Sequence, residues 1–252
     1  EILIITTPND KLAFQNLLGD GDNWGIKINY EIQEKPEGLA QAFTIAELFI
    51  KDCPSALFLG DNLFHGSSFI KTLREANNID KGAKVFAYPV VNPQDYGVVL
   101  LDNNGKPVKI EEKPDNPKSR LAITGIYFYD ETAIERSKAI KKSTRGEYEI
   151  SSLNQMYLDD NQLEVYILSR GTAWLDTGTH DSLCEAGTFV RTLETRQGLK
   201  VGCPEEVAWR NGWIDSNKLE DLAMGMSKSG YGNYLLKLLE ENKGNQYLIN
   251  TQ

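Results

Sequence analysis

Histidine is scarce in this chain, which contains only His65 and His180 among 252 residues. A zinc site needs about four ligands at fixed spacing, and a Ser/His/Asp relay needs a histidine held by an acid. Neither arrangement is visible in the sequence. Each histidine follows an aspartate by four residues (Asp61 and Asp176), so a mixed Asp/His metal site stays open as a weaker alternative. We therefore expect any chemistry to use carboxylates, lysine, arginine and a hard cation.

Cysteine is also rare. Cys53, Cys184 and Cys203 are odd in number and far apart, and no CxxC pair occurs. This usage suits a reducing compartment such as the cytoplasm better than a disulfide framework. We expect all three to be small buried residues.

Two further absences limit the partners. No window approaches about 20 consecutive apolar residues and no basic-then-apolar leader is present, so neither a membrane span nor a signal peptide is expected. Lys and Arg number 27 against 36 Asp and Glu, a net charge of -9, and no basic stripe offsets it. Nucleic acid is therefore not an expected partner. A small anionic ligand could still bind where a few cations or a metal are focused.

Apolar periodicity predicts an α/β fold. Strands are expected at 2–6, 26–32, 56–59 and 84–90, with a helical segment between each pair. Crossovers of this length predict a mostly parallel, three-layer sheet. After residue 90 a hairpin is expected around Asn103-Asn104-Gly105, and strands at 123–129 and 163–168. From Pro204 onward only helical signals occur, so we expect a core at 1–200 and a helical region at 201–252.

Two aspartates follow apolar runs in similar positions, Asp61 in FLGDN and Asp176 in WLDTG. Ligands of parallel α/β sheets gather at the carboxyl ends of strands. Two carboxylates there suit Mg²⁺, which takes one or two from the protein and completes its shell with water and phosphate. Each residue alone could equally be a helix cap or a turn residue.

Other candidates carry weaker signals. In IEEKP, strand alternation sends Glu112 to one face and Glu111 and Lys113 to the other. A carboxylate can accept hydrogen bonds from sugar hydroxyls and a lysine can bind phosphate, although the charge pattern alone favours a solvated edge-strand ion pair. Arg145 could bind phosphate or lie on the surface. The Gln33 amide could form hydrogen bonds with the polar edge of a pyrimidine base. Pro36 would fix a turn nearby, and Gly38 would let the backbone approach a ligand closely.

Taken in order, several stretches resemble one family: YEIQEKPEGLAQAF, FLGDNLFHG, FAYPVVNPQDYGVVLLD, IEEKPDNPKS, AITGIYFYD, RGEYEIS, AWLDTGTHDSL and RQGLKVGCPEEVAWRNGWI. They are similar to glucose-1-phosphate thymidylyltransferases of the sugar nucleotidyltransferase superfamily, from Glu1 to about Tyr234. The resemblance implies a Rossmann-like fold of the nucleotide-diphospho-sugar transferase type. It also implies transfer of thymidylyl from dTTP to α-D-glucose 1-phosphate, giving dTDP-glucose and pyrophosphate for rhamnose-type and other cell-surface polysaccharides. A cytoplasmic homotetramer is the implied state.

The resemblance also assigns roles to residues. Asp61 and Asp176 would hold Mg²⁺, and Gln33, Pro36 and Gly38 would contact the nucleotide. The sugar phosphate would be bound by Tyr96, Gly97, Glu112, Lys113, Tyr127 and Arg145. A second, regulatory nucleotide site would involve His65, Gly66, Arg170, Glu206 and Arg210.

One departure is notable, because the family begins with a strand and a GGxGTRL loop that bind the triphosphate. About 50 residues are expected to be missing before Glu1, judged from where the family pattern resumes, and the chain as written is expected to be inactive. Two alternatives are kept: another nucleotidyltransferase of this fold, such as a uridylyltransferase, or a non-catalytic sugar-nucleotide-binding protein. A dinucleotide-dependent oxidoreductase is disfavoured because no GxGxxG follows a strand.

Overall fold

The structure, a computed structural model, describes residues 1–244 of the chain. The chain folds into two compact units. The larger unit spans 33–191, and the second combines 1–32 with the chain from residue 192 onward. No helix among the described residues is long and apolar enough to cross a bilayer.

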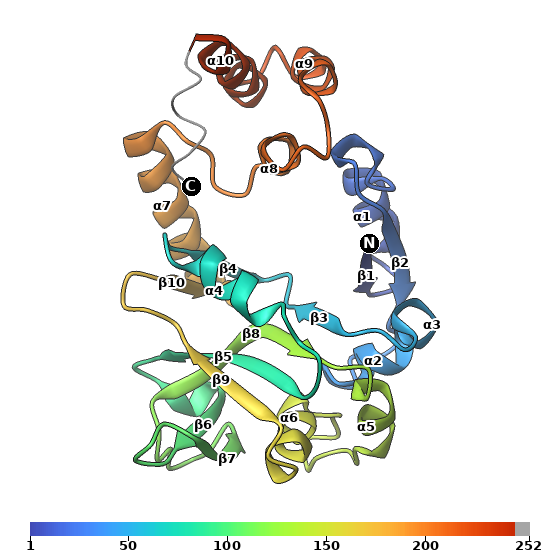
Figure 1. The fold of residues 1–252 in the computed structure, drawn as a ribbon, viewed down its shortest axis with the longest axis vertical. Helices are drawn as coiled ribbons and strands as arrows, with labels where there is room; N and C mark the ends of the chain where they lie inside the picture. The colour runs from blue at the N-terminus through green and yellow to red at the C-terminus, as the bar shows by residue number, and fades with distance from the viewer. Residues whose placement is uncertain (245–252) are drawn as a thin grey trace. The chain divides into compact units, whose positions relative to one another are not determined.

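The larger unit contains a six-stranded sheet with helices around it (Figure 1). Its strands are β3 (Ser55–Phe58), β5 (Ala83–Pro89), β6 (Gly97–Leu101), β7 (Pro107–Glu112), β8 (Leu121–Tyr129) and β9 (Leu163–Ile167). Its helices are α2 (Gln41–Ile45), α3 (Glu47–Ile50), α4 (Phe69–Ala76), α5 (Ala133–Ala139), α6 (Ile150–Asp159), the short η2 (Pro93–Asp95) and the start of α7 (His180–Gln197). The predicted hairpin is present, since β6 and β7 pair antiparallel around the Asn-Gly turn.

Strand directions in this sheet are mixed. β3, β5 and β6 each pair antiparallel with β8, and β9 pairs parallel with β5, so four strands run one way while β7 and β8 run the other. The α/β fold with a helical C-terminal region is confirmed. The expectation of a mostly parallel sheet is wrong for strand pairing, since β5–β9 is the one parallel ladder of this sheet and the other four are antiparallel. The reason is that β8 lies between β5 on one edge and β3 and β6 on the other and runs antiparallel to all three.

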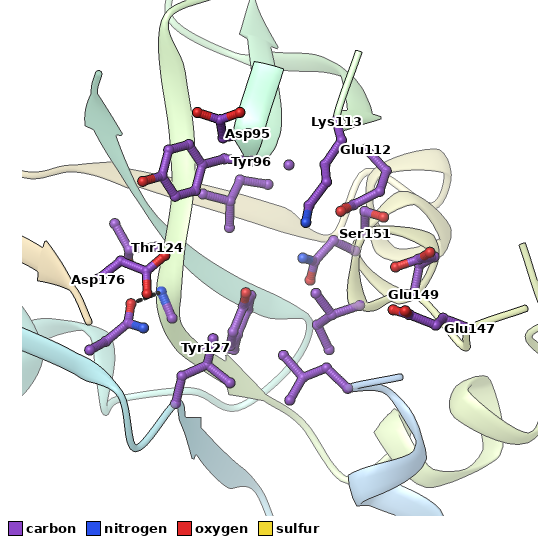
Figure 2. Close-up of a pocket in the computed structure, with 18 of the residues that line it drawn as sticks. Asp95, Tyr96, Glu112, Lys113, Thr124, Tyr127, Glu147, Glu149, Ser151 and Asp176 are labelled. Atoms are coloured by element: carbon purple, nitrogen blue, oxygen red, sulfur yellow. Dashed lines mark hydrogen bonds between the residues drawn. The ribbon is translucent and has the colours of Figure 1, made fainter. Parts of the chain in front are cut away.

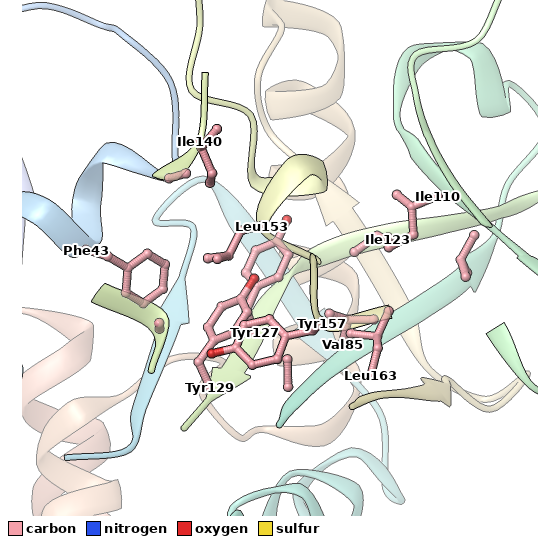
Figure 3. Close-up of a cluster of buried hydrophobic side chains, with 14 of the residues drawn as sticks. Phe43, Val85, Ile110, Ile123, Tyr127, Tyr129, Ile140, Leu153, Tyr157 and Leu163 are labelled. Atoms are coloured by element: carbon pink, nitrogen blue, oxygen red, sulfur yellow. The ribbon is translucent and has the colours of Figure 1, made fainter. Parts of the chain in front are cut away.

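Side chains of β5 and β8 alternate between two apolar layers, which gives the predicted three-layer arrangement. Val85, Tyr127 and Tyr129 pack against α2, α5 and α6 through Phe43, Ala133 and Leu153 (Figure 3). Phe86 and Phe128 face the other way and pack against Phe69 and Ala76 of α4. Burying both faces in this way explains why β8 is almost continuously apolar.

A separate two-stranded ribbon lies in the same unit and was not expected from the sequence. β4 (Asn62–His65) pairs antiparallel with β10 (Ala173–Asp176), with Asn62 opposite Asp176 and His65 opposite Ala173. Only a helical segment was predicted between the strands at 56–59 and 84–90, and the four residues of β4 are too short a run to be recognised as a strand. The ribbon brings the two aspartate motifs together.

The second unit has its own core. β1 (Ile2–Thr6) and β2 (Ile28–Ile32) form a parallel pair flanking α1 (Lys11–Leu18) and η1 (Asp22–Trp24). α8 (Pro204–Arg210), α9 (Ser216–Gly225) and α10 (Gly230–Gly244) bury a cluster that includes Ala208, Leu219 and Leu235, and Trp24 packs against it. The expected boundary at residue 200 stays a prediction.

The cysteines correct one expectation. Cys203 is buried, as predicted, and is a free thiol. Cys53 and Cys184 are exposed free thiols, so the expectation that all three are buried is wrong. Cys53 lies in the turn between α3 and β3, and Cys184 lies on an outward face of α7, where apolar periodicity does not report burial.

Candidate active site

A cavity opens where β8 lacks a partner on one edge. β5 pairs along β8 from Leu121 to Tyr129. On the other edge β3 pairs with 126–129 and β6 with Ala122, which leaves Ile123–Gly125 outside both ladders. These residues line a cavity of about 230 Å³ within the larger unit (Figure 2). That volume, just below the ~300 Å³ at which typical ligand pockets begin, suits a small polar ligand.

The loop between β3 and β4 is held against Gly125. Leu59 donates its N–H to the Gly125 carbonyl (2.9 Å), and the Gly125 N–H donates to Asn62 Oδ1 (3.2 Å). A Cβ at position 125 would lie 2.6 Å from Asn62 Oδ1. Glycine is therefore required here by close packing, and this contact fixes the loop that carries Asp61.

Asp61 and Asp176 lie at the same end of the β4–β10 ribbon. The Thr177 N–H and hydroxyl both donate to the Asp61 carbonyl, at 2.9 and 2.8 Å. Asp176 lines the cavity, and Asp61 precedes Asn62, which also lines it. Neither carboxylate has an ion-pair partner in the described part of the chain. The backbones of the two residues lie at one end of the ribbon, and carboxylates free of cations are the hard oxygen donors that a divalent ion of the Mg²⁺ type takes.

The turn alternatives fare differently for the two aspartates. Asp61 leads into a strand, so it does not cap a helix, but it is a turn residue, because the Asn62 N–H donates to the Leu59 carbonyl at 3.2 Å; its Oδ1 accepts from Asn62 Nδ2 at 2.8 Å. Asp176 Oδ1 accepts the Gly178 N–H at 3.1 Å, which is an Asx-type turn. No group of three or more His, Cys, Asp or Glu residues arranged to hold a metal occurs within residues 1–244. His65 and His180 therefore form no mixed Asp/His cluster of that size there.

Lys113 contradicts the alternation expected for IEEKP. β7 ends at Glu112, and Lys113 has a φ of 39°, in the left-handed region that non-glycine residues rarely adopt. Its N–H donates to the Tyr96 carbonyl at 3.1 Å. The reversal places Lys113 on the same cavity as Glu112, into which its side chain extends (Figure 2). Such backbone strain, worth roughly 1–3 kcal/mol, concentrates at functional sites.

Arg145 faces three carboxylates from the turn before α6. Its guanidinium lies 3.5 Å from Glu112 and Glu147 and 3.6 Å from Glu149. Burial is the main reason why the pKa of Glu112 is raised; a hydrogen bond from Ser151 lowers it and the charge of Glu149 raises it further. Arg145 is exposed and also lines the cavity, and its ion pair with the half-buried Glu112 is partly open to solvent on the edge strand β7, so both alternatives stay open.

Aromatic rings form another wall of the cavity. Tyr96 lies with its ring 5.2 Å from that of Trp174, whose Nε1–H donates to Asn62 Oδ1 at 2.7 Å. Tyr127 is buried, and burial followed by the charge of Glu112 raises its pKa. Trp174 was missed in the sequence because its apolar neighbours made it look like an ordinary core residue.

Gln33, Pro36 and Gly38 belong to the same unit but do not line the cavity. Gln33 Nε2 donates to the Gly38 carbonyl (3.1 Å) and to Gln41 Oε1 (2.7 Å). Gly38 has a φ of 106°, and a Cβ there would lie 2.5 Å from the Tyr148 carbonyl oxygen. Packing thus explains this glycine fully, and its nucleotide role stays a prediction.

The five residues expected at a regulatory site fall in different units. His65 packs its ring 5.8 Å from that of Phe189, and Gly66 packs on Thr172. Arg170 lies in the same unit, whereas Glu206 and Arg210 form a 2.7 Å ion pair in the other. The regulatory site therefore remains a prediction.

Known proteins are similar to this chain over nearly its whole length. The sequence profile of the nucleotidyl transferase family matches residues 1–192. This chain belongs to that family. A glucose-1-phosphate thymidylyltransferase of Neisseria meningitidis serogroup A is 55% identical over 241 residues, covering 96% of this chain and 84% of the relative. The enzyme of the same name from Mycobacterium tuberculosis is 54% identical over 242 residues, with the same two shares.

Solved structures agree with this family assignment. The crystal structure of a Bacillus anthracis protein bearing the same enzyme name, in complex with a sucrose, has a TM-score of 0.71 and 35% identity, covering 81% of this chain and 79% of that one. A UDP-glucose pyrophosphorylase complexed with UDP-glucose has a TM-score of 0.63, covering 76% and 81%, at 20% identity. The second likeness shows the fold alone, and it places this nucleotidyl transferase in the Rossmann-like class expected from the sequence.

Proposed function

We propose that this protein is a glucose-1-phosphate thymidylyltransferase, which joins dTTP and α-D-glucose 1-phosphate to give dTDP-glucose and pyrophosphate. The observation that carries the proposal is the cavity itself. It combines a hydroxyl-binding carboxylate (Glu112), two cations (Lys113 and Arg145) and the two adjacent aspartates, Asp176 lining the cavity and Asp61 directly beside it. The curated relatives at 54 and 55% identity carry this enzyme name, which selects the nucleotide and sugar among those that such a cavity could take.

The reaction needs positioning and charge neutralisation rather than a covalent intermediate. A phosphate oxygen of glucose 1-phosphate attacks the α-phosphorus of dTTP in line, and pyrophosphate leaves with the electrons of the broken P–O bond. Lys113 and Arg145 bind the sugar phosphate and hold the attacking oxygen, while Glu112 accepts hydrogen bonds from sugar hydroxyls. Aligning the reactants and placing fixed charges around them are the main contributions in phosphoryl-type transfer.

Arg145 is prepared for an anionic ligand by its surroundings. Its three carboxylate contacts are all 3.5 Å or longer, beyond the 2.7–2.9 Å of strong charge-assisted bonds. The carboxylates orient the guanidinium without saturating its donors. An incoming phosphate can therefore form shorter bonds to the same group.

We assign Asp61 and Asp176 as the carboxylates that hold Mg²⁺. When bound, the ion neutralises charge on the nucleotide phosphates. Asn62 and Gly178 each donate to one oxygen of these carboxylates, which keeps both side chains oriented in the protein alone. Gln33, Pro36 and Gly38 would contact the thymine nucleotide.

The remaining assignments rest on the family resemblance. They are a homotetramer, a cytoplasmic location, supply of dTDP-glucose for rhamnose-type and other cell-surface polysaccharides, and a regulatory nucleotide site involving His65, Gly66, Arg170, Glu206 and Arg210. The free cysteines agree with a reducing location.

The test is pyrophosphate release by the full-length protein with glucose 1-phosphate, comparing dTTP with UTP at equal concentration and Mg²⁺. We expect dTTP to give the higher kcat/KM, together with formation of dTDP-glucose. Preference for UTP would favour a uridylyltransferase. Calorimetric binding of dTDP-glucose without any pyrophosphate release would instead indicate a non-catalytic binding protein.

A further inference from the structure

Two polar atoms in the cavity wall have no hydrogen-bond partner in the described part of the chain. They are Thr124 Oγ1 on β8 and Asn154 Nδ2 on α6. Both residues are 0% exposed and both line the cavity. Buried polar groups in native proteins are nearly always paired, so each exception requires an explanation. A ligand in the cavity would provide the missing partners.

The orientation of Asn154 is fixed by a neighbour. The Tyr129 hydroxyl donates to Asn154 Oδ1 at 2.5 Å. Burial raises the pKa of Tyr129 well above its ordinary value, so this hydroxyl stays protonated and remains a donor. The amide oxygen is thereby occupied. The NH₂ group is left with two donors and, within residues 1–244, nothing to receive them.

Thr124 occupies an irregular part of β8. The β5–β8 register shifts between Val85 and Ala87, which pair with Tyr127 and Ile123, so three residues of β8 oppose Phe86 alone. Irregularities of this kind often re-aim side chains next to active sites. Thr124 is fully buried there, a position where valine would fill the same space without a hydroxyl. The hydroxyl can both donate and accept one hydrogen bond.

We propose that Thr124 Oγ1 and Asn154 Nδ2 bind hydroxyl groups of the sugar ring and make the cavity select against sugars that lack them. This inference rests on the proposed function and adds two specificity-determining residues to it. Glu112 only accepts hydrogen bonds when ionised, whereas the Asn154 amide only donates here. Glu112 can therefore accept from the hydrogen of a sugar hydroxyl, and Asn154 can donate to the oxygen of one. A deoxy sugar would leave these buried groups unpaired, which is the situation in which enzymes discriminate strongly.

The test compares glucose 1-phosphate with its 2-, 3-, 4- and 6-deoxy analogues in the full-length protein. In the unsubstituted protein we expect at least one analogue to lose about 10-fold or more in kcat/KM, a loss typical of one hydrogen bond. Thr124→Ala should raise the KM for glucose 1-phosphate by about 10-fold and abolish the penalty on the matching analogue. The KM for dTTP should not change. Asn154→Asp keeps the oxygen that Tyr129 requires and removes the donors, and it should act on an analogue in the same way.

Two control variants separate recognition from folding. Thr124→Ser keeps the hydroxyl and should restore the discrimination that Thr124→Ala loses. Ser55→Ala removes a hydroxyl that is also buried and unpaired but does not line the cavity, so it should change neither KM nor analogue preference.

The outcomes distinguish this inference from the proposed function. Absence of thymidylyl transfer in the unsubstituted protein would overturn the proposed function. Normal transfer combined with an unchanged analogue preference in Thr124→Ala and Asn154→Asp would overturn only the inference, and would indicate that ordered water satisfies both atoms.

Discussion

Glu112 and Asp130 are two inward-facing carboxyl groups of one unit whose pKa values are shifted in opposite directions. Burial raises the pKa of Asp130, but hydrogen bonds from Thr132, Gly82 and Tyr157 outweigh it and lower the pKa. Four donors reach its two oxygens at 2.6 to 3.0 Å. For Glu112 burial dominates and the pKa is raised, because its contact with Arg145 is 3.5 Å long and Glu149 repels it.

The contrast separates a structural carboxylate from a binding one. The protein supplies every partner that Asp130 needs, so its charge stabilises the fold. The cavity leaves Glu112 incompletely neutralised, as it leaves Thr124 and Asn154 unpaired within the described residues. Binding groups must keep some of their hydrogen-bonding capacity for the ligand, and the folded protein is less stable for it. Substituting Asp130 should therefore lower the stability of the fold, whereas substituting a cavity residue should change substrate binding or turnover.

The largest effect is expected for Asp61→Asn. Removing one of two proposed metal carboxylates should lower turnover by at least ~100-fold, the usual scale for losing a group that stabilises developing charge. Because Asp61 is exposed, the free energy of unfolding should change little. The measurement is kcat at saturating substrates across Mg²⁺ concentrations, together with urea unfolding.

Asp80→Asn provides the matched control, since Asp80 is an exposed aspartate that does not line the cavity. It should leave both activity and stability unchanged. A near-normal rate for Asp61→Asn would refute the metal assignment.

The opposite pattern is expected for Asp130→Asn. Asn can keep the three bonds accepted by Oδ1, but its NH₂ group would then face the Gly82 N–H, which now donates to Oδ2 at 2.6 Å. An unpaired buried donor costs about 1–3 kcal/mol in the free energy of unfolding. Because the pKa of Asp130 is lowered, its stabilisation is present above its ordinary pKa and is lost as pH falls. The deficit of the variant should therefore be largest at neutral pH and shrink on acidification in urea unfolding, with kcat/KM per folded molecule unchanged.

The sequence predicted the layers of the fold better than its strand pairing. Apolar periodicity located most strands and the Asn-Gly turn located the hairpin, because both signals are local. The reversed β8 and the four-residue β4 depend on partners far along the chain, which periodicity does not report. Asp61 and Asp176 do lie together, but through the β4–β10 ribbon and not through the carboxyl ends of a parallel sheet.

The sequence predicted the site residues whose side-chain chemistry is distinctive, and it missed those that only the backbone geometry places in the cavity. Glu112 and Arg145 were candidates because a carboxylate can bind sugar hydroxyls and a guanidinium can bind phosphate. Lys113 was assigned to the wrong face, since alternation cannot anticipate its left-handed backbone. Thr124 and Asn154 gave no signal at all. A threonine in a β-strand and an asparagine in a helix become notable only once their unpaired atoms are located in the cavity.

The smallest effect is expected for Glu112→Gln, and it has the opposite pH dependence to that of Asp130→Asn. A raised pKa means that ionised Glu112 destabilises the folded protein, so wild-type stability falls as pH rises from the ordinary value of 4.5 through the raised one. Gln removes this charge, and the variant should match wild type in acid and exceed it at neutral pH. Loss of a charge-assisted bond should raise the KM for glucose 1-phosphate by about 10-fold, with dTTP affinity intact. Urea unfolding across pH and separate KM values test both parts; a variant that is less stable at neutral pH, or whose dTTP affinity alone falls, would place Glu112 with Asp130 as a structural carboxylate.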